Sequence, residues 1–332
     1  MTLTGYTDFD ANLWEIVYEG VYNGNKLHWT DYDRVINRAL ARGFDKIIIQ
    51  ATELKPCRRA LEIAREFNDH PRRVFTSTGL QPSYPHMYMD LLGPREKYRP
   101  YVENILIKNR RYVTCVGKTG LMFTKAGIEA CSKEKQIDYL NMHLEFAAEY
   151  GLPIVLQSRN SAKETLECLK AFEGKVTPVL SSFSGTMSEA ETYLKLGAYI
   201  GISGCSLKRT RNINVVKSLP LSRILLGSDC PYCKLKRDSP SYKYVKTKFR
   251  AENRRFWSPS APVKGRTEPI HVIQLVEATA GIRGVEVGVV VEETWKNFHD
   301  VFFSSNSSPE LTAPSIKHPE TQAHSCTDSF CR

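Results

Sequence analysis

Short apolar runs that end in polar residues recur eight times along the chain, and each has the length of a β-strand. The runs are nearly continuous in apolar residues, which a sheet buried on both faces requires. Segments with apolar residues at helical spacing separate them. The predicted strands cover residues 6–12, 46–52, 73–81, 112–121, 152–158, 176–183, 198–204 and 224–229.

Capping residues predict where the intervening helices begin. Thr30 precedes the first helix, and Ser161 and Ser188 each stand three residues before a glutamate, the spacing of a capping box. Strand and helix therefore alternate eight times, which favours a TIM-type (β/α)8 barrel as one domain over residues 1–303.

In such a barrel the chemistry lies at the carboxyl ends of the strands, so the polar residues there form the candidate site. The first and last strands are neighbours in a closed barrel. Their carboxylates can therefore supply oxygen ligands for Mg²⁺ or Mn²⁺; the alternative is that Asp8 and Asp10 only cap loops. The candidate residues are Asp8, Asp10, Asn12, Gln81, Lys118, Gln157, Arg159, Ser181 and Asp229.

Several stretches at these strand ends resemble a known family. They are DFDANL, GLQP, VGKTGL, LQSRNS, SFSGT, YIGISGCSLK and SDCPYC, followed by TEPIHVIQLVE. Over roughly residues 6–303 the sequence resembles the TatD-type deoxyribonucleases, and within them the eukaryotic TatD-domain subgroup. The resemblance implies a TIM barrel that hydrolyses phosphodiesters with bound metal ions.

The resemblance breaks at the metal ligands. Lys118 stands where the family has a bridging glutamate, and Gln81, Gln157 and Ser181 stand where it has histidines, whereas Asp229 matches the family aspartate. An ammonium in place of a carboxylate opposes cation binding. We therefore expect a catalytically weak or inactive pseudoenzyme with no cofactor.

Two consequences follow for Asp229. If a residual site of Asp229, Asp10 and Asp8 is occupied, it would hold Mg²⁺ or Mn²⁺ weakly, with Asp229 as the catalytic residue. Otherwise we expect an ion pair between Lys118 and Asp229. The alternative is that Lys118 reaches solvent and Asp229 accepts hydrogen bonds from backbone amides.

Residues 234–266 form a basic and aromatic insertion after the last strand, in a chain of net charge +10. This pattern predicts binding to nucleic acid, DNA in preference to RNA, with low sequence specificity. The alternative is a solvated face whose aromatic rings pack on the barrel. The residues expected to contact the ligand are Lys118, Arg159, Asn12 and Gln157, with Tyr244 and Trp257 stacking on bases.

Two other functions remain open from the sequence. One is an active Mg²⁺- or Mn²⁺-dependent DNA exonuclease that uses the residual aspartates, and the other is a scaffold that binds a protein partner.

The nine cysteines are odd in number and scattered, which favours reduced thiols. Cys230 and Cys233 have the spacing of a redox pair, but their place after seven strand–helix units favours a strand end and a loop. Residues 304–332 have the composition of a disordered tail. With no signal peptide and no apolar run long enough for a membrane span, a cytoplasmic or nuclear protein is expected.

Overall fold

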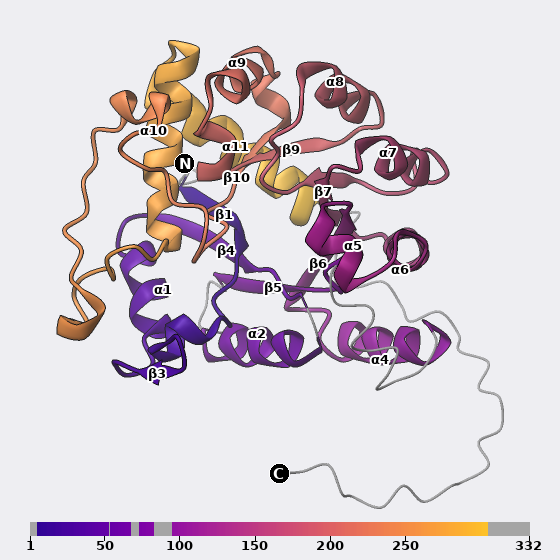
Figure 1. The fold of residues 1–332 in the computed structure, drawn as a ribbon, viewed down its shortest axis with the longest axis horizontal. Coiled ribbons are helices and arrows are strands. Elements are labelled where there is room, and N and C mark those ends of the chain that lie inside the picture. Colours follow the sequence, from indigo (N-terminus) through magenta and orange to yellow (C-terminus); the bar gives the residue numbers. More distant parts are fainter. Residues whose placement is uncertain (1–4, 53, 68–72, 83–94, 305–332) are drawn as a thin grey trace, which may run out of the picture.

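The structure is a computed structural model that describes residues 5–52, 54–67, 73–82 and 95–304. Eight parallel strands form one sheet in the order β1-β4-β5-β6-β7-β8-β9-β10 (Figure 1). The predicted tail, apart from Ser304, lies outside the described residues. The strands are β1 (Tyr6–Ala11), β4 (Phe44–Ile49), β5 (Val74–Thr78), β6 (Val113–Met122), β7 (Ile154–Arg159), β8 (Pro178–Leu180), β9 (Tyr199–Ile202) and β10 (Ile224–Leu226).

The last strand returns to the first and closes the barrel. Ala11 forms a parallel bridge with Cys230, and the Asp229 N–H donates to Asp10 O at 2.7 Å. Each of the eight predicted strands coincides with one of these strands, and the predicted barrel is confirmed. A separate hairpin of β2 (Val21–Tyr22) and β3 (Asn25–Lys26) follows β1.

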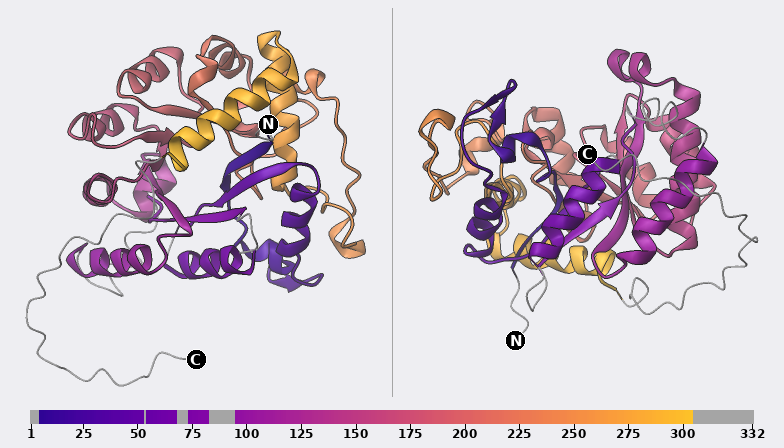
Figure 2. Two further views of the ribbon diagram at one scale, coloured as in Figure 1. Left: turned by 180° about the vertical axis from the view of Figure 1, so that it is seen from behind. Right: turned by 90° about the horizontal axis from the view of Figure 1, so that it is seen from below.

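Helices alternate with the strands and surround the sheet, as the two opposite views in Figures 1 and 2 show. They are α1 (Tyr32–Leu40), α2 (Leu54–Glu66), α4 (Arg95–Lys108), α5 (Lys125–Ala130), α6 (Lys133–Glu149), α7 (Ala162–Lys170), α8 (Met187–Lys195), α9 (Thr210–Ser218), α10 (Val272–Arg283) and α11 (Val287–Phe302). No helix in these described segments is long and apolar enough to cross a membrane.

Two of the predicted helix starts are wrong. The N-cap of α1 is Asp31 rather than Thr30, and the N-cap of α8 is Thr186, two residues before Ser188, with Thr186 and Glu189 forming the capping box. Ser161 is the N-cap of α7 as predicted, but its hydroxyl makes no capping bond and donates to Leu121 O instead. Ser161 therefore ties the start of α7 to the end of β6.

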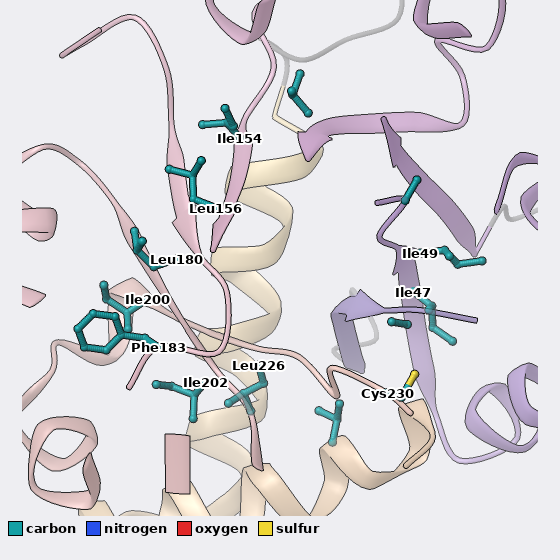
Figure 3. Packing of buried hydrophobic residues seen from close by; sticks show 14 of the residues in the cluster. Ile47, Ile49, Ile154, Leu156, Leu180, Phe183, Ile200, Ile202, Leu226 and Cys230 are labelled. Atoms are coloured by element: carbon teal, nitrogen blue, oxygen red, sulfur yellow. The ribbon is translucent and has the colours of Figure 1, made fainter. Parts of the chain in front are cut away.

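Two groups of apolar side chains hold the barrel together. Strand residues such as Ile47, Ile49, Leu156 and Ile200 belong to the large cluster beneath the helices (Figure 3). A second cluster lies inside the barrel and takes one residue from nearly every strand, together with the last turns of α11. Its buried members are Phe9, Ile48, Phe75, Cys115, Val155, Val179, Leu225, Phe298, Val301 and Phe302.

Helix α11 closes the end of the barrel at which the strands begin. His299 contacts Asp45 near the start of β4, and Asn297 donates to Ile224 O at the start of β10. With apolar side chains filling that end and the middle of the barrel, the polar residues at the opposite end face the opening. The candidate site therefore lies at the carboxyl ends of the strands.

Candidate functional site at the carboxyl ends of the strands

A cavity of about 270 Å³ opens at the carboxyl ends of the strands and brings together six of the predicted site residues. We call it the mouth cavity. The predicted residues that line it are Asn12, Gln81, Lys118, Gln157, Ser181 and Asp229. Gln81 Nε2 donates to Gln157 Oε1 at 3.2 Å across one side of the cavity.

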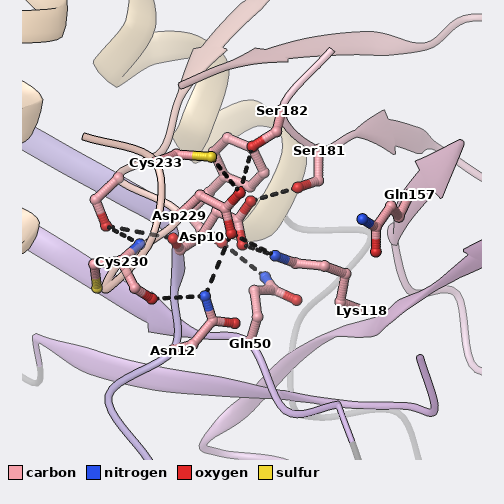
Figure 4. Close-up of polar contacts among 12 residues, drawn as sticks. Asp10, Asn12, Gln50, Lys118, Gln157, Ser181, Ser182, Asp229, Cys230 and Cys233 are labelled. Atoms are coloured by element: carbon pink, nitrogen blue, oxygen red, sulfur yellow. Dashed lines mark hydrogen bonds and ion pairs between the residues drawn. The ribbon is translucent and has the colours of Figure 1, made fainter. Parts of the chain in front are cut away.

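Lys118 lies between two carboxylates in the mouth cavity (Figure 4). Its Nζ is 2.6 Å from Asp10 Oδ1 and 3.0 Å from Asp229 Oδ1. All three side chains are largely removed from solvent, with exposed fractions of 6% for Lys118, 1% for Asp10 and 15% for Asp229. The predicted Lys118–Asp229 ion pair is confirmed, and Asp10 is an additional partner.

An irregularity in β1 brings Asp10 to this position. The register between β1 and β4 shifts between Asp8 and Ala11, so that Phe9 and Asp10 both stand opposite Ile48. A β-bulge of this kind redirects side chains locally. Phe9 joins the apolar cluster inside the barrel while Asp10 reaches Lys118. Gly227 makes room, since a Cβ there would lie 2.7 Å from Asp10 Cβ.

Two neighbouring serines complete the hydrogen bonds of the carboxylates. Ser181 Oγ donates to Asp10 Oδ2, and Ser182 Oγ donates to Asp229 Oδ2 at 2.8 Å. Ser182 and Asp229 both adopt the left-handed conformation, with φ of 48° and 46°. Non-glycine residues hold this conformation only where their surroundings compensate its cost, and such residues are frequent at functional sites.

Lys118 is the only source of positive charge in direct contact with the two carboxylates among the described residues. Burial lowers the pKa of Lys118, but the charges of Asp10 and Asp229 outweigh it and raise that pKa above its ordinary value. Burial raises the pKa of Asp229, and the Lys118 charge and the Ser182 hydrogen bond more than offset this, leaving it lowered. For Asp10, burial and the charge of Asp229 outweigh the charge of Lys118, and the pKa of Asp10 is raised.

Asp8 does not join this group. Its Oδ1 accepts the backbone N–H of Asp10 at 3.0 Å and that of Ser228 at 2.9 Å, so it holds β1 against the residues after β10. Burial raises the pKa of Asp8 to about 7, although its hydrogen bonds to Ser228 oppose the shift. For Asp8, the geometry matches the alternative that it caps backbone groups; for Asp10 it does not.

The residues present do not fit the metal centre that the family resemblance implies. Among the described residues, no three His, Cys, Asp or Glu side chains gather as a possible metal-binding group. Lys118 Nζ contacts the two aspartates at the distances of direct ion pairs, and its charge would repel a cation placed between them. Asp229 and Asp10 are therefore engaged with Lys118 in this structure.

Arg159, at the end of β7, lies beside the mouth cavity rather than in it. Its guanidinium is half-buried, and burial lowers its pKa while the charges of Asp229 and Asp10 act against that shift. The contact of Arg159 with a phosphate stays a prediction.

The basic insertion, residues 234–266, runs along the outside of the barrel past α10 and α1 (Figure 1). Arg266 is not a free cation of this segment, because it is buried and bonded to Asp31 and Glu268. Lys234 is half-buried. The exposed cations are Lys236, Arg237, Lys243, Lys246, Lys248, Arg250, Arg254, Arg255 and Lys264.

The two aromatic residues predicted to stack on bases are used within the protein. Trp257 stacks on His28 with ring centroids 5.4 Å apart, and its Nε1 donates to Asp31. Tyr244 packs against α10 so closely that a Cβ at Gly281 would lie 2.4 Å from its ring. This arrangement matches the alternative expectation that the aromatic rings pack on the barrel. The exposed ring of the segment is that of Phe256.

The expectation of reduced thiols is wrong for two cysteines. Cys205, after β9, forms a disulfide with Cys233, after β10, and Cys230 remains a buried free thiol. Cys233 Sγ lies 3.2 Å from Asp229 Oδ2 (Figure 4). The pair joins two loops at the mouth cavity, and no short-range motif in the sequence indicates a partner 28 residues away.

Sequence reasoning also missed Ser182, which holds Asp229, and Gln50, whose Nε2 donates to Phe9 O at 2.7 Å beneath the site. Ser182 lies beside the predicted site residue Ser181 near the end of a predicted strand, so its position offered a signal. Gln50 lies within a predicted strand and offered none.

Comparisons with known proteins agree with this architecture. The model of the family "TatD related DNase" matches residues 23–303. The chain is 26% identical to the Schizosaccharomyces pombe protein named deoxyribonuclease Tat-D, over 88% of this chain and 94% of that protein. It is 28% identical to the 3'-5' ssDNA/RNA exonuclease TatD of Erwinia tasmaniensis, over 82% of this chain and 93% of that protein.

A solved structure with the same fold is that of a TatD family hydrolase from Entamoeba histolytica. It superposes with a TM-score of 0.84 at 26% identity and covers 91% of this chain and 99% of its own. Because the family model spans most of the chain and both curated relatives are matched over nearly their whole length, this chain belongs to the TatD-related DNase family.

Proposed function

We propose that this TatD-family protein binds nucleic acid, DNA in preference to RNA, and that it is catalytically weak or inactive as a nuclease. The weak or absent nuclease activity is inferred from the position of Lys118, whose Nζ lies 2.6 Å from Asp10 and 3.0 Å from Asp229. Metal-assisted hydrolysis needs an open coordination position on a cation held by carboxylates or imidazoles. An ammonium supplies charge but no such position.

The binding half is supported by charge at the rim of the barrel. A groove of about 530 Å³ beside the mouth is lined by Arg254, Lys264 and Tyr232, and Tyr232 also lines the mouth cavity. Phe256, with 77% of its surface exposed, follows Arg254 and Arg255. Exposed cations next to exposed rings suit the backbone and the bases of a single strand.

Salt dependence tests the binding. Because cations that contact phosphates release counterions, the slope of log affinity against log salt is about −0.7 per contact on single strands. Three to five contacts would give a slope of about −2 to −3.5. Arg254→Gln and Lys264→Gln should each reduce the slope by roughly one contact, whereas Lys125→Gln, a matched exposed lysine on α5, should not. A salt-independent signal would contradict the proposal.

Cleavage assays test the catalytic half. Labelled single- and double-stranded DNA is incubated with Mg²⁺ or Mn²⁺ and wild type, Asp229→Asn, Lys118→Gln or Lys118→Glu. Little or no cleavage by wild type, with a gain only in Lys118→Glu, would identify Lys118 as the residue that prevents catalysis. Lys118→Gln is the control, because it removes the ammonium without adding a carboxylate.

The alternative function is an active Mg²⁺- or Mn²⁺-dependent exonuclease that uses Asp229 and Asp10. Its support is the similarity to the Erwinia tasmaniensis protein named as a 3'-5' ssDNA/RNA exonuclease. Cleavage by wild type that Asp229→Asn abolishes would establish this alternative and overturn the proposal.

A further inference from the structure

A second and larger cavity, of about 650 Å³, lies beside the mouth cavity. It opens between the residues that follow β7, the residues that follow β8 and one face of α9. We call it the β7–β8 pocket. It shares its strands with the candidate site, since Gln157 and Ser181 line the mouth cavity while Arg159 and Ser184 line this pocket.

The pocket is lined by two cations and one anion. Arg159 comes from the end of β7 and Arg211 from the first turn of α9. Neither forms an ion pair with any described carboxylate. Glu189 is the one acidic residue of its lining within the described chain, and its carboxylate already accepts the N–H and the hydroxyl of Thr186. The charge of the pocket therefore suits an anionic ligand.

The size and remaining walls of the pocket indicate more than an inorganic anion. Phe183, Met187 and Val215 give it apolar surface, and Asn160 and Asn214 offer amide groups. A volume of about 650 Å³ lies within the range of sites for small organic ligands, and a single phosphate would leave most of it empty. An anion joined to a flat or apolar body matches these walls better.

We infer that the β7–β8 pocket binds a phosphorylated nucleotide, with the phosphate on Arg159 and Arg211 and the nucleoside against the apolar wall. Arginine suits this role because its planar guanidinium can donate two hydrogen bonds to one phosphate. The charge of Arg159 also interacts with those of Asp229 and Asp10, so a bound phosphate would lie next to the candidate site.

The inference rests on the proposed function for the source of the nucleotide, which we take to be the phosphorylated end of a bound strand. A free mononucleotide has the same chemistry. The two sources are separated by measuring the affinity of the full chain for one short single-stranded DNA with a 5'-phosphate, with a 3'-phosphate, or with neither. Deoxyadenosine monophosphate and inorganic phosphate are then used alone as competitors.

We expect either the strand with the 5'-phosphate or the strand with the 3'-phosphate to bind about tenfold more tightly than the unphosphorylated strand. A factor of about ten is the typical contribution of one hydrogen bond between charged groups. Arg211→Gln and Arg159→Gln should remove this difference. Lys217→Gln should keep it, because Lys217 lies on the same helix but off the face formed by Arg211, Asn214 and Val215. Arg211 and Lys217 are both exposed, so both variants are expected to fold.

The outcomes separate this inference from the proposed function. Equal affinity for all three strands, with no competition by the mononucleotide, would overturn the inference and leave nucleic-acid binding intact. Direct binding of the mononucleotide that depends on Arg211, with no binding of any strand, would support the pocket and overturn the proposed function. Inorganic phosphate competing as well as the mononucleotide would contradict the role of the apolar wall.

Discussion

Replacing Lys118 by methionine should strongly destabilise the protein at neutral pH. Each contact of Lys118 Nζ, at 2.6 Å with Asp10 and 3.0 Å with Asp229, has a Coulomb energy of about 5 to 6 kcal/mol at an effective dielectric constant of about 20. Desolvation of the ammonium and repulsion between the carboxylates offset part of this. Removing one member of a buried ion pair typically costs about 3 to 5 kcal/mol, which is the loss we expect.

The pH dependence of this loss identifies its cause. In the wild type the pKa of Asp229 is lowered, so its contribution to stability is present above the ordinary aspartate pKa and is lost as the pH falls. In Lys118→Met the two buried carboxylates have no cation, so their pKa values rise and the variant loses stability as the pH increases. The difference between the two proteins should therefore be largest near neutral pH and shrink toward about pH 4.

Urea denaturation followed by circular dichroism at several pH values measures this difference. The control is Lys125→Met, since Lys125 is 91% exposed and lies 4.0 Å from Glu129; an exposed pair of this kind contributes less than about 1 kcal/mol. Adding Asp10→Asn to Lys118→Met should restore part of the stability, because one uncompensated carboxylate is removed. A loss below about 1 kcal/mol that does not change with pH would refute the ion-pair reasoning.

Three further predictions concern residues around the site. Asp8 should contribute about 3 kcal/mol less to wild-type stability at pH 7 than at about pH 4, because burial opposes its ionisation, and Asp8→Asn should remove this part of the pH dependence in urea titrations. Reducing Cys205–Cys233, which closes a 28-residue separation, should lower the free energy of unfolding by about 3 to 4 kcal/mol, measured with and without dithiothreitol. Arg266→Gln should cost about 3 to 5 kcal/mol in the same assay, because Asp31 would stay buried without a cation, while Glu268 keeps its ion pair with Arg38.

Each of these three predictions would be contradicted by a particular result. Parallel pH profiles for wild type and Asp8→Asn would show that Asp8 does not ionise in this range. Equal stability in oxidising and reducing buffer, or two free thiols at these positions under oxidising conditions, would contradict the disulfide. A small effect of Arg266→Gln would contradict the stabilising role of the buried ion pair between Arg266 and Asp31.

The barrel was predictable because its signals are local. Each strand is an apolar run long enough to cross a sheet buried on both faces, and the eight runs indicate eight strands whatever their exact bounds. Strand ends were less predictable. β8 stops at Leu180 and β10 at Leu226, earlier than the apolar runs suggest, and the left-handed residues Ser182 and Asp229 follow them. Those conformations depend on contacts across the barrel.

The first residues of the helices were likewise hard to predict from local sequence patterns. Thr186 with Glu189 and Ser188 with Glu191 both have the spacing of a capping box, and the sequence pattern alone does not choose between them. In the structure Thr186 is the cap, because its hydroxyl accepts the N–H of Glu189 and its own N–H donates to the Glu189 carboxylate. Local patterns therefore predicted that a helix follows β8 but placed its first turn two residues late.

The sequence predicted six of the residues that line the mouth cavity, but only part of their arrangement. Strand ends of a closed barrel meet, so Lys118 and Asp229 were expected to pair. The position of Asp10 depends on the shift in register between β1 and β4, which no pattern in the sequence marks. The pairing of Cys205 with Cys233 and the use of Tyr244 and Trp257 in packing likewise depend on contacts between distant segments.

On the proposed interpretation, the arrangement around Lys118 also explains how Asp10 and Asp229 stay buried without a bound metal. Two carboxylates at the mouth of a barrel repel each other and are costly to bury, so a cation must compensate them. Lys118 provides that charge from within the chain, and Ser181 and Ser182 satisfy the remaining carboxylate oxygens. These contacts compensate the two buried carboxylates without an added ion. The same contacts occupy the oxygens through which Asp10 and Asp229 would otherwise bind one, so on the proposed interpretation stability and hydrolysis compete for the same two side chains.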